Sequence, residues 1–238
     1  MTKNLANSKG FTLVELSIVI IIIGFLIAGI AAGQSLIKQA ALNKIITDAQ
    51  SYTMIINSFK LKYGYYPGDS LNASAYWPAC DPTPANCDGD GDGFVEWPNE
   101  PFRAWQSLAL SGLISGTYNG TTEAPIVAYG DIVKDGFWRV ETYTGQIYTL
   151  PGYSKTTLGL LSPVETVING ANAFWIDSRV DDGIPSNGRV QGLDVLGFGC
   201  VKQSDGVTTA FFNYNSLETL YNLTDNFPGC GRLLFYLD

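Results

Sequence analysis

The chain opens with a polar leader, MTKNLANSKG, that continues into a long apolar segment. The leader contains Lys3 and Lys9, and no charged side chain occurs between Leu16 and Ile37. One carboxylate, Glu15, lies within the apolar segment, which begins at Phe11. About 20 consecutive apolar residues are enough for a helix to cross a bilayer. The pattern therefore predicts a membrane-spanning helix that carries an acidic residue close to its start.

A helical pattern continues beyond the apolar segment, now with only one apolar face. The apolar and aromatic positions recur at alternating steps of four and three residues, the spacing of one helical face. They are Ile45, Ala49, Tyr52, Ile56, Phe59 and Tyr63. Gly64 is a suitable stop. We expect one helix from Phe11 to Tyr63, about 80 Å long, in which residues 11–34 cross the membrane and an amphipathic helix over 35–64 continues into a head.

After Gly64 the chain changes to short apolar runs separated by turn residues. We expect residues 65–238 to form a β-rich globular head. The run from Phe102 to Ile114 predicts a short amphipathic helix, and residues from about Pro163 to Val180 predict another. Segments rich in β-branched and aromatic residues predict strands at 124–130, 136–144, 146–152, 189–201 and 208–214. A turn at Gly145 would join the second and third of these segments as a hairpin.

The composition excludes several classes of function. The chain of 238 residues contains no histidine and has a formal net charge of -8. Without histidine, Ser-His-Asp triads, Cys-His dyads and ordinary zinc sites are excluded. Nucleic-acid binding is not expected, because it needs a concentrated basic surface. A carboxylate hydrolase would need two acids about 5 to 9 Å apart in a cleft, and no pair in the sequence demands this, so we do not expect an enzyme.

The cysteines form two local pairs in the sequence, Cys80 with Cys87 and Cys200 with Cys230. Neither pair has the C-x-x-C spacing of zinc or redox sites. An even number of cysteines behind a membrane-targeting segment indicates disulfides in an oxidising compartment. Three connectivities are possible, and we favour the two local pairs. The alternative is four buried free thiols in a cytosolic domain.

The stretch CDGDGDGFVEWPNE is the strongest candidate for a ligand site. Three aspartates alternate with glycine at positions 1, 3 and 5, and glycine follows at position 6, as in the opening of an EF-hand calcium loop. Position 12 is Asn99, where that loop has a bidentate glutamate. We expect a calcium-stabilised loop, and the alternative is a solvated acidic turn. The expected calcium (Ca2+) ligands are Asp88, Asp90, Asp92 and Glu96.

A weaker acidic group lies in the stretch IDSRVDDGIPSNGRV. Asp177 and Asp181 are four residues apart and could share a helical face. We favour a structural ion pair of Asp181 with Arg179 or Arg189 over a second metal site.

The residues KGFTLVELSIVIIIIG, from Lys9 to Gly24, resemble the type IV prepilin signature that type IV pilins share with the pseudopilins of type II secretion systems. The resemblance implies that a prepilin peptidase cleaves between Gly10 and Phe11, so that residues 1–10 are a cleaved leader, and that Phe11 becomes N-methylated. It also implies that Glu15 pairs with the terminal amine of a neighbouring subunit. Such an ammonium would keep a carboxylate charged within an apolar environment.

The resemblance also implies a fold and a location. The fold class is α+β, with a long N-terminal helix packed on an antiparallel β-sheet head. The lysines of the leader would keep it cytoplasmic and place the head in the periplasm. The single-pass inner-membrane precursor would use the inner-membrane assembly platform to polymerise with itself or other pilins, giving an extracellular pilus or a periplasmic pseudopilus. The large head favours a minor or specialised subunit, with a filament-tip adhesin or DNA-uptake pilin as the alternative.

Overall fold

The computed structural model describes most of the chain. The described residues are 10–78, 80, 87–122, 124–129, 132–144, 154–161, 167–193, 199–203, 219–224 and 229–237. The expected leader therefore lies outside them, apart from its last residue. The chain divides into two compact units, residues 1–40 and residues 41–238, and each unit is described by itself.

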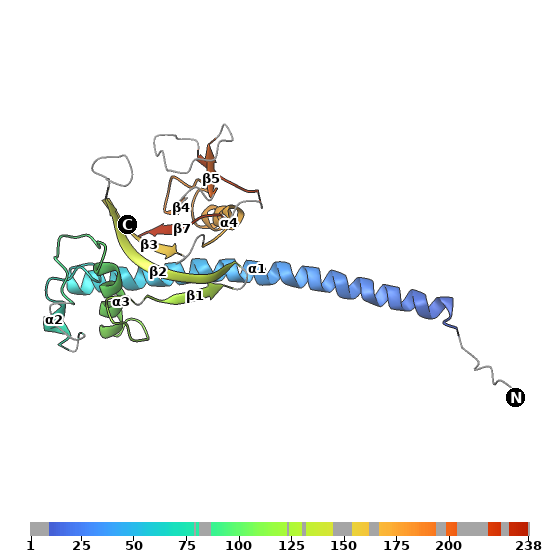
Figure 1. Cartoon of the computed structure of the whole chain (residues 1–238), viewed down its shortest axis with the longest axis horizontal. Helices are drawn as coiled ribbons and strands as arrows, with labels where there is room; N and C mark the ends of the chain where they lie inside the picture. The colour runs from blue at the N-terminus through green and yellow to red at the C-terminus, as the bar shows by residue number, and fades with distance from the viewer. Residues whose placement is uncertain are drawn as a thin grey trace, which may run out of the picture. The chain divides into compact units, whose positions relative to one another are not determined.

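Helix α1, Leu13–Tyr63, contains 51 residues and is drawn in blue to cyan in Figure 1. From Leu13 to Ala32 every residue is exposed, and this part of α1 is long and apolar enough to cross a membrane. From Ala41 onward the helix has a buried face, made of Leu42, Ile45, Ile46, Ala49, Ile56 and Phe59. The six positions of the predicted stripe are all buried or half-buried. The periodicity therefore located the packed face of α1 correctly.

The second unit contains an antiparallel five-stranded sheet with strand order β1-β2-β3-β7-β4. The strands, in that order, are Ile126–Tyr129, Val133–Thr144, Ser154–Leu161, Arg232–Tyr236 and Val190–Leu193. A separate antiparallel pair joins β5, Val201–Gln203, to β6, Thr219–Tyr221. Three short helices complete the described elements: α2 Ala73–Tyr76, α3 Glu100–Leu110 and α4 Gly170–Val180. The predicted α+β class, a long N-terminal helix with an antiparallel sheet, is confirmed.

The core of this unit joins α1, α3 and the sheet through aromatic side chains. Trp105 of α3 and Trp138 of β2 are fully buried. The ring of Tyr52 on α1 contacts both, with centroid distances of 5.1 and 5.9 Å. Tyr129 of β1 donates its hydroxyl to Asp48 at 2.8 Å and accepts the indole N–H of Trp138 at 3.0 Å. These contacts fix the second part of α1 against β1, β2 and α3.

The two helices that the sequence predicts in the head, at 102–114 and 163–180, have different boundaries in the structure. Helix α4 begins at Gly170 because the side chain of Asn169 accepts the backbone N–H of Asn172, which caps the helix. Helix α3 ends at Leu110 because Gly112, at φ 74°, turns the chain and its N–H donates to the carbonyl of Ala109. Capping residues therefore shortened both helices.

Only the first strand of the predicted hairpin around Gly145 lies among the described residues. Its first strand lies in β2, but its turn and second strand fall in 145–153, outside the described residues. The described partner of β2 is β3, in a register that runs from Phe137 opposite Leu161 to Thr144 opposite Ser154. The predicted strand at 189–201 contains β4 and the first residue of β5, with 194–198 outside the described part. The predicted strand at 208–214 lies wholly outside it.

Candidate assembly segment and acidic loop

Helix α1 begins with reciprocal hydrogen bonds between Thr12 and Glu15. The carboxylate Oε2 of Glu15 accepts the backbone N–H and the hydroxyl of Thr12, each at 2.8 Å. The backbone N–H of Glu15 donates to the hydroxyl oxygen of Thr12 at 3.3 Å. This arrangement is a capping box, which satisfies backbone donors that a helix start otherwise leaves free. Sequence analysis missed this role, although the T-x-x-E spacing is its usual signal.

The expected processing site lies just before this cap. Gly10 and Phe11 precede α1 and have no helical structure. The Phe11 side chain is 86 % exposed. Both members of the capping box follow the Gly10–Phe11 bond, so cleavage at that bond would leave the box intact.

The first part of α1, from Leu13 to Ala40, exposes large apolar side chains on every side. Ile20 to Ile23 are four consecutive isoleucines, and they point around the full circumference because the helix turns once in 3.6 residues. The exposed large apolar residues in this part are Leu13, Val14, Leu16, Ile18, Val19, Ile20, Ile21, Ile22, Ile23, Phe25, Leu26, Ile27, Ile30, Leu36 and Ile37. A helix that is apolar on all sides needs lipid or other apolar helices around it.

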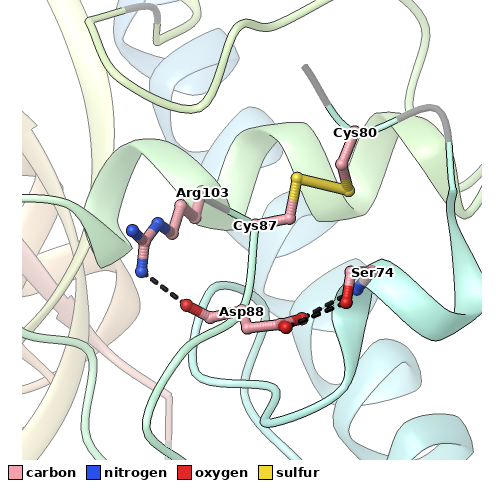
Figure 2. The surroundings of a disulfide bond; sticks show 5 residues. All are labelled: Ser74, Cys80, Cys87, Asp88 and Arg103. Atoms are coloured by element: carbon pink, nitrogen blue, oxygen red, sulfur yellow. Dashed lines mark hydrogen bonds between the residues drawn. A yellow bond between two sulfur atoms is a disulfide. The ribbon is translucent and has the colours of Figure 1, made fainter. Parts of the chain in front are cut away.

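Both predicted disulfides, Cys80–Cys87 and Cys200–Cys230, are present. Figure 2 shows that Asp88, next to the first disulfide, points toward α2. Its two carboxylate oxygens accept the backbone N–H and the hydroxyl of Ser74, each at 2.8 Å. Its backbone carbonyl accepts the guanidinium of Arg103 at 2.6 Å. Asp88 therefore ties this loop to α2 and α3.

Asp90 and Asp92, the next two predicted calcium ligands, lie together with a residue that sequence analysis did not select. Each of these two residues and Asp69 offers one carboxylate oxygen, and the three oxygens lie within 4.8 Å of one another. Asp88 and Glu96 are not in this group. The Glu96 side chain is exposed, whereas its backbone N–H donates to Glu100 at 2.9 Å.

Asp69 reaches the acidic loop because Gly68 packs closely against α3. Gly68 has φ 91°, and a Cβ there would overlap the backbone of Glu100 and Ala104. Glycine is the residue that combines this dihedral with such close contact. The backbone N–H of Gly89 donates to the carbonyl of Ser70 at 2.9 Å. The Y-P-G-D segment after α1 and the D-G-D-G-D-G loop therefore cross at this point, and no local sequence pattern predicts that crossing.

Each carboxylate of the group uses one oxygen to accept a backbone N–H. Asp69 Oδ2 accepts from Gly93 at 3.0 Å. Asp90 Oδ1 accepts from Asp92 at 3.3 Å, and Asp92 Oδ1 accepts from Phe94 at 2.8 Å. Asp69 is fully buried, and its second oxygen, Oδ1, has no hydrogen-bond partner among the described residues.

Glu100 lies beside this group at the start of α3. It is buried, and its two carboxylate oxygens accept the backbone N–H groups of Asp90 at 3.2 Å and Glu96 at 2.9 Å. Burial raises the pKa of Asp69 to about 7, and the negative charge of Glu100 adds to this effect. The backbone N–H groups of Gly93 and Gly91 oppose the rise in the pKa of Asp69. Burial also raises the pKa of Glu100.

A second acidic group contains Asp177, Asp181 and Asp182, and its buried member is fully paired. Asp177 Oδ1 accepts the backbone N–H of Gly183 at 3.2 Å, and Oδ2 accepts the Tyr221 hydroxyl at 2.8 Å. Burial raises the pKa of Asp177 to about 7, and these two hydrogen bonds oppose the rise.

The ion pair predicted for Asp181 is absent from the described ion pairs. Asp181 Oδ2 instead accepts the backbone N–H groups of Arg189 and Val190. The carboxylate therefore closes the turn after α4 by accepting backbone N–H groups. No sequence pattern distinguishes such backbone hydrogen bonds from an ion pair with a side chain.

Comparison with known proteins gives one match. Residues 5–31 match the family model of the prokaryotic N-terminal methylation motif. No curated protein and no solved structure matches the chain. The matched segment includes Gly10, Phe11, Thr12 and Glu15. It therefore carries the signature of type IV pilins and pseudopilins, as the resemblance of the leader and apolar segment predicted.

Proposed function

We propose that this chain is a minor or specialised structural subunit of a type IV pilus or a type II secretion pseudopilus, and that it polymerises through the first part of α1. The observation that carries the proposal is the methylation motif at 5–31 on a helix whose apolar side chains are exposed on all sides. The motif implies a prepilin peptidase as the processing enzyme and other pilins as partners. It implies a structural role rather than catalysis.

The same exposed surface serves two environments in this proposal. Before assembly, the apolar part of α1 lies in the inner membrane, because lipid solvates a helix with no polar face. During assembly, apolar helices of other subunits replace the lipid. Gly24, Gly29 and Gly33 interrupt this part of α1, and a Cβ at each would meet open space in the single chain. Small residues of this kind let neighbouring helices approach closely.

Glu15 can keep its cap and accept a second partner. Its Oε2 is occupied by Thr12. No hydrogen bond to its Oε1 occurs among the described residues. After cleavage at Gly10, the new amine of Phe11 on a neighbouring subunit is a suitable cation for Oε1. An ion pair between subunits would set the axial position of one helix against the next.

The variant Glu15→Gln tests this role without removing the helix cap. Glutamine also serves in a capping box, so the variant removes the charge and keeps the local structure. We expect cleavage to continue and the amount of subunit in sheared filaments to fall at least about tenfold, because a charge pair within an apolar assembly is removed. Immunoblots of filament and membrane fractions measure this.

The matched control is Thr12→Ala, which removes the hydroxyl but leaves the charge of Glu15. It should lower helix stability slightly and leave most of the subunit in filaments. Normal entry of cleaved Glu15→Gln into filaments would contradict the pairing role.

A further inference from the structure

We propose that Asp69, Asp90 and Asp92 form a calcium site on the head. This ligand set differs from the one that the D-G-D-G-D-G pattern predicts, because Asp69 from the segment after α1 takes the place of Asp88 and Glu96. One carboxylate oxygen of each residue lies within 4.8 Å of the others. A single cation can contact three oxygens at that spacing, since calcium–oxygen distances are about 2.3 to 2.6 Å.

The strongest observation is the unpaired oxygen of Asp69. This side chain is 0 % exposed, so water does not solvate it. Its Oδ2 accepts from Gly93, while Oδ1 has no partner among the described residues. A buried carboxylate oxygen without a partner is uncommon and calls for an explanation. A bound cation supplies the missing contact.

None of the three carboxylates forms an ion pair with another described residue. The ion pairs between described residues join Lys44 to Asp48, and Arg139 and Arg232 to Glu141. None involves the acidic loop. Arg103, which lies next to this loop, donates to the backbone carbonyl of Asp88. Three ionised carboxylates this close repel one another in a partly buried position, and a bound divalent cation would favour their ionised form.

The ligand type favours calcium over other divalent metals. The group offers only carboxylate oxygens, and the chain has no histidine. Hard oxygen ligands suit calcium and magnesium, whereas zinc and copper prefer nitrogen and sulfur. Carboxylates from two crossing loops form an irregular site, and calcium accepts irregular geometry where magnesium requires a near-ideal octahedron. Backbone carbonyls and water would complete the coordination.

The test uses the full chain in detergent, stripped of metal and titrated with calcium chloride in a calorimeter. We expect one calcium per chain with a Kd no weaker than about 1 mM, the range of extracellular calcium modules. Saturating calcium should raise the unfolding midpoint of the head by about 3 °C over the value in chelator. Magnesium chloride should bind more weakly. Absence of calcium binding at several millimolar, or equal binding of magnesium, would overturn the proposal.

Matched variants distinguish the two ligand sets. Asp69→Asn and Asp92→Asn should each weaken calcium binding at least about tenfold, because each removes one charged ligand. Glu96→Gln and Asp88→Asn should keep the wild-type Kd, although Asp88→Asn should lower stability equally with and without calcium. Loss of calcium binding in Asp88→Asn with retention in Asp69→Asn would overturn the assignment. If Asp69→Asn fails to fold, Asp88→Asn and Glu96→Gln decide, because only the predicted set contains those two residues: a wild-type Kd in both supports the assignment, and loss of calcium binding in either would overturn it.

Discussion

The two parts of helix α1 contain similar apolar residues, but only the second part buries them within its own chain. From Leu13 to Ala32 every residue is exposed, whereas from Leu42 to Phe59 one face packs into the head. The second part obtains its stability from contacts within its own chain, such as that of Tyr52 with Trp105. The first part must obtain it from lipid or from other chains. Only the second part therefore contributes to the folding of the head.

A pair of truncations tests this difference most strongly. Ile56 is fully buried in the core, whereas Ile21 is 57 % exposed. Ile56→Ala should lower the free energy of unfolding of the head by about 2 to 5 kcal/mol, the usual cost of a cavity. Ile21→Ala should leave it unchanged. Denaturant unfolding of the full chain in detergent measures both, and equal losses would contradict the comparison.

Insertion of a charge tests the other side of the difference. Ile22→Lys places a cation in the middle of the exposed apolar part, at a cost of about 2.5 to 3.5 kcal/mol for membrane insertion. We expect much of this variant to leave the membrane fraction on alkaline extraction. Met54 is 64 % exposed on the second part of α1, so Met54→Lys is the matched control and should stay in the membrane. Similar extraction of both would refute the assignment of the two parts.

A polar contact also distinguishes the second part of α1. The Tyr129 hydroxyl bridges Asp48 of α1 and the indole of Trp138. Tyr129→Phe removes both hydrogen bonds and leaves a buried indole N–H unpaired, which should cost about 1 to 3 kcal/mol of head stability. Thermal unfolding checks this. An unchanged midpoint would mean that the bridge contributes nothing to the packing of α1 on the sheet.

The stability of the head should also depend on pH through Asp177, whereas the apolar part of α1 contributes no such dependence. The pKa of Asp177 is about 7 in the folded chain, above the value of about 3.9 for an unfolded aspartate. Between these values the folded state holds a proton that the unfolded state has lost. The contribution of Asp177 to the free energy of unfolding is complete below about pH 4 and is lost as the pH rises through 7. The slope of this loss is at most about 1.4 kcal/mol per pH unit.

The groups that face Asp177 are Tyr221, Asp181 and Asp182. Asp177→Asn keeps the side-chain shape and removes the titrating carboxyl group. The free energy of unfolding of this variant should therefore fall less between pH 5 and pH 8 than that of the wild type. The measurement is denaturant unfolding in chelator across that range. An identical slope in the two proteins would show that Asp177 does not titrate in it.

The sequence predicted the features that depend on local patterns. The apolar segment, the buried stripe of α1 and both disulfide pairs follow from spacing along the chain, and the structure contains all of them. The ends of α3 and α4 differed because single residues, Gly112 and Asn169, set them. A one-residue signal is easily lost beside a longer periodic pattern.

The acidic loop shows where local patterns fail. The D-G-D-G-D-G spacing treats Asp88, Asp90 and Asp92 as equivalent, yet the structure turns Asp88 toward Ser74 and brings Asp69 to the other two. This exchange depends on the crossing of two distant segments at Gly68 and Gly89. Tertiary contacts of that kind leave no periodic trace in the sequence.

The intact mass of the protein recovered from a filament fraction tests the central claim most directly. A subunit that polymerises through the first part of α1 should begin at Phe11, carry one added methyl group and retain the whole apolar segment. Its four cysteines should be oxidised. A chain in that fraction that still begins at Met1, or that lacks the apolar segment, would contradict the account.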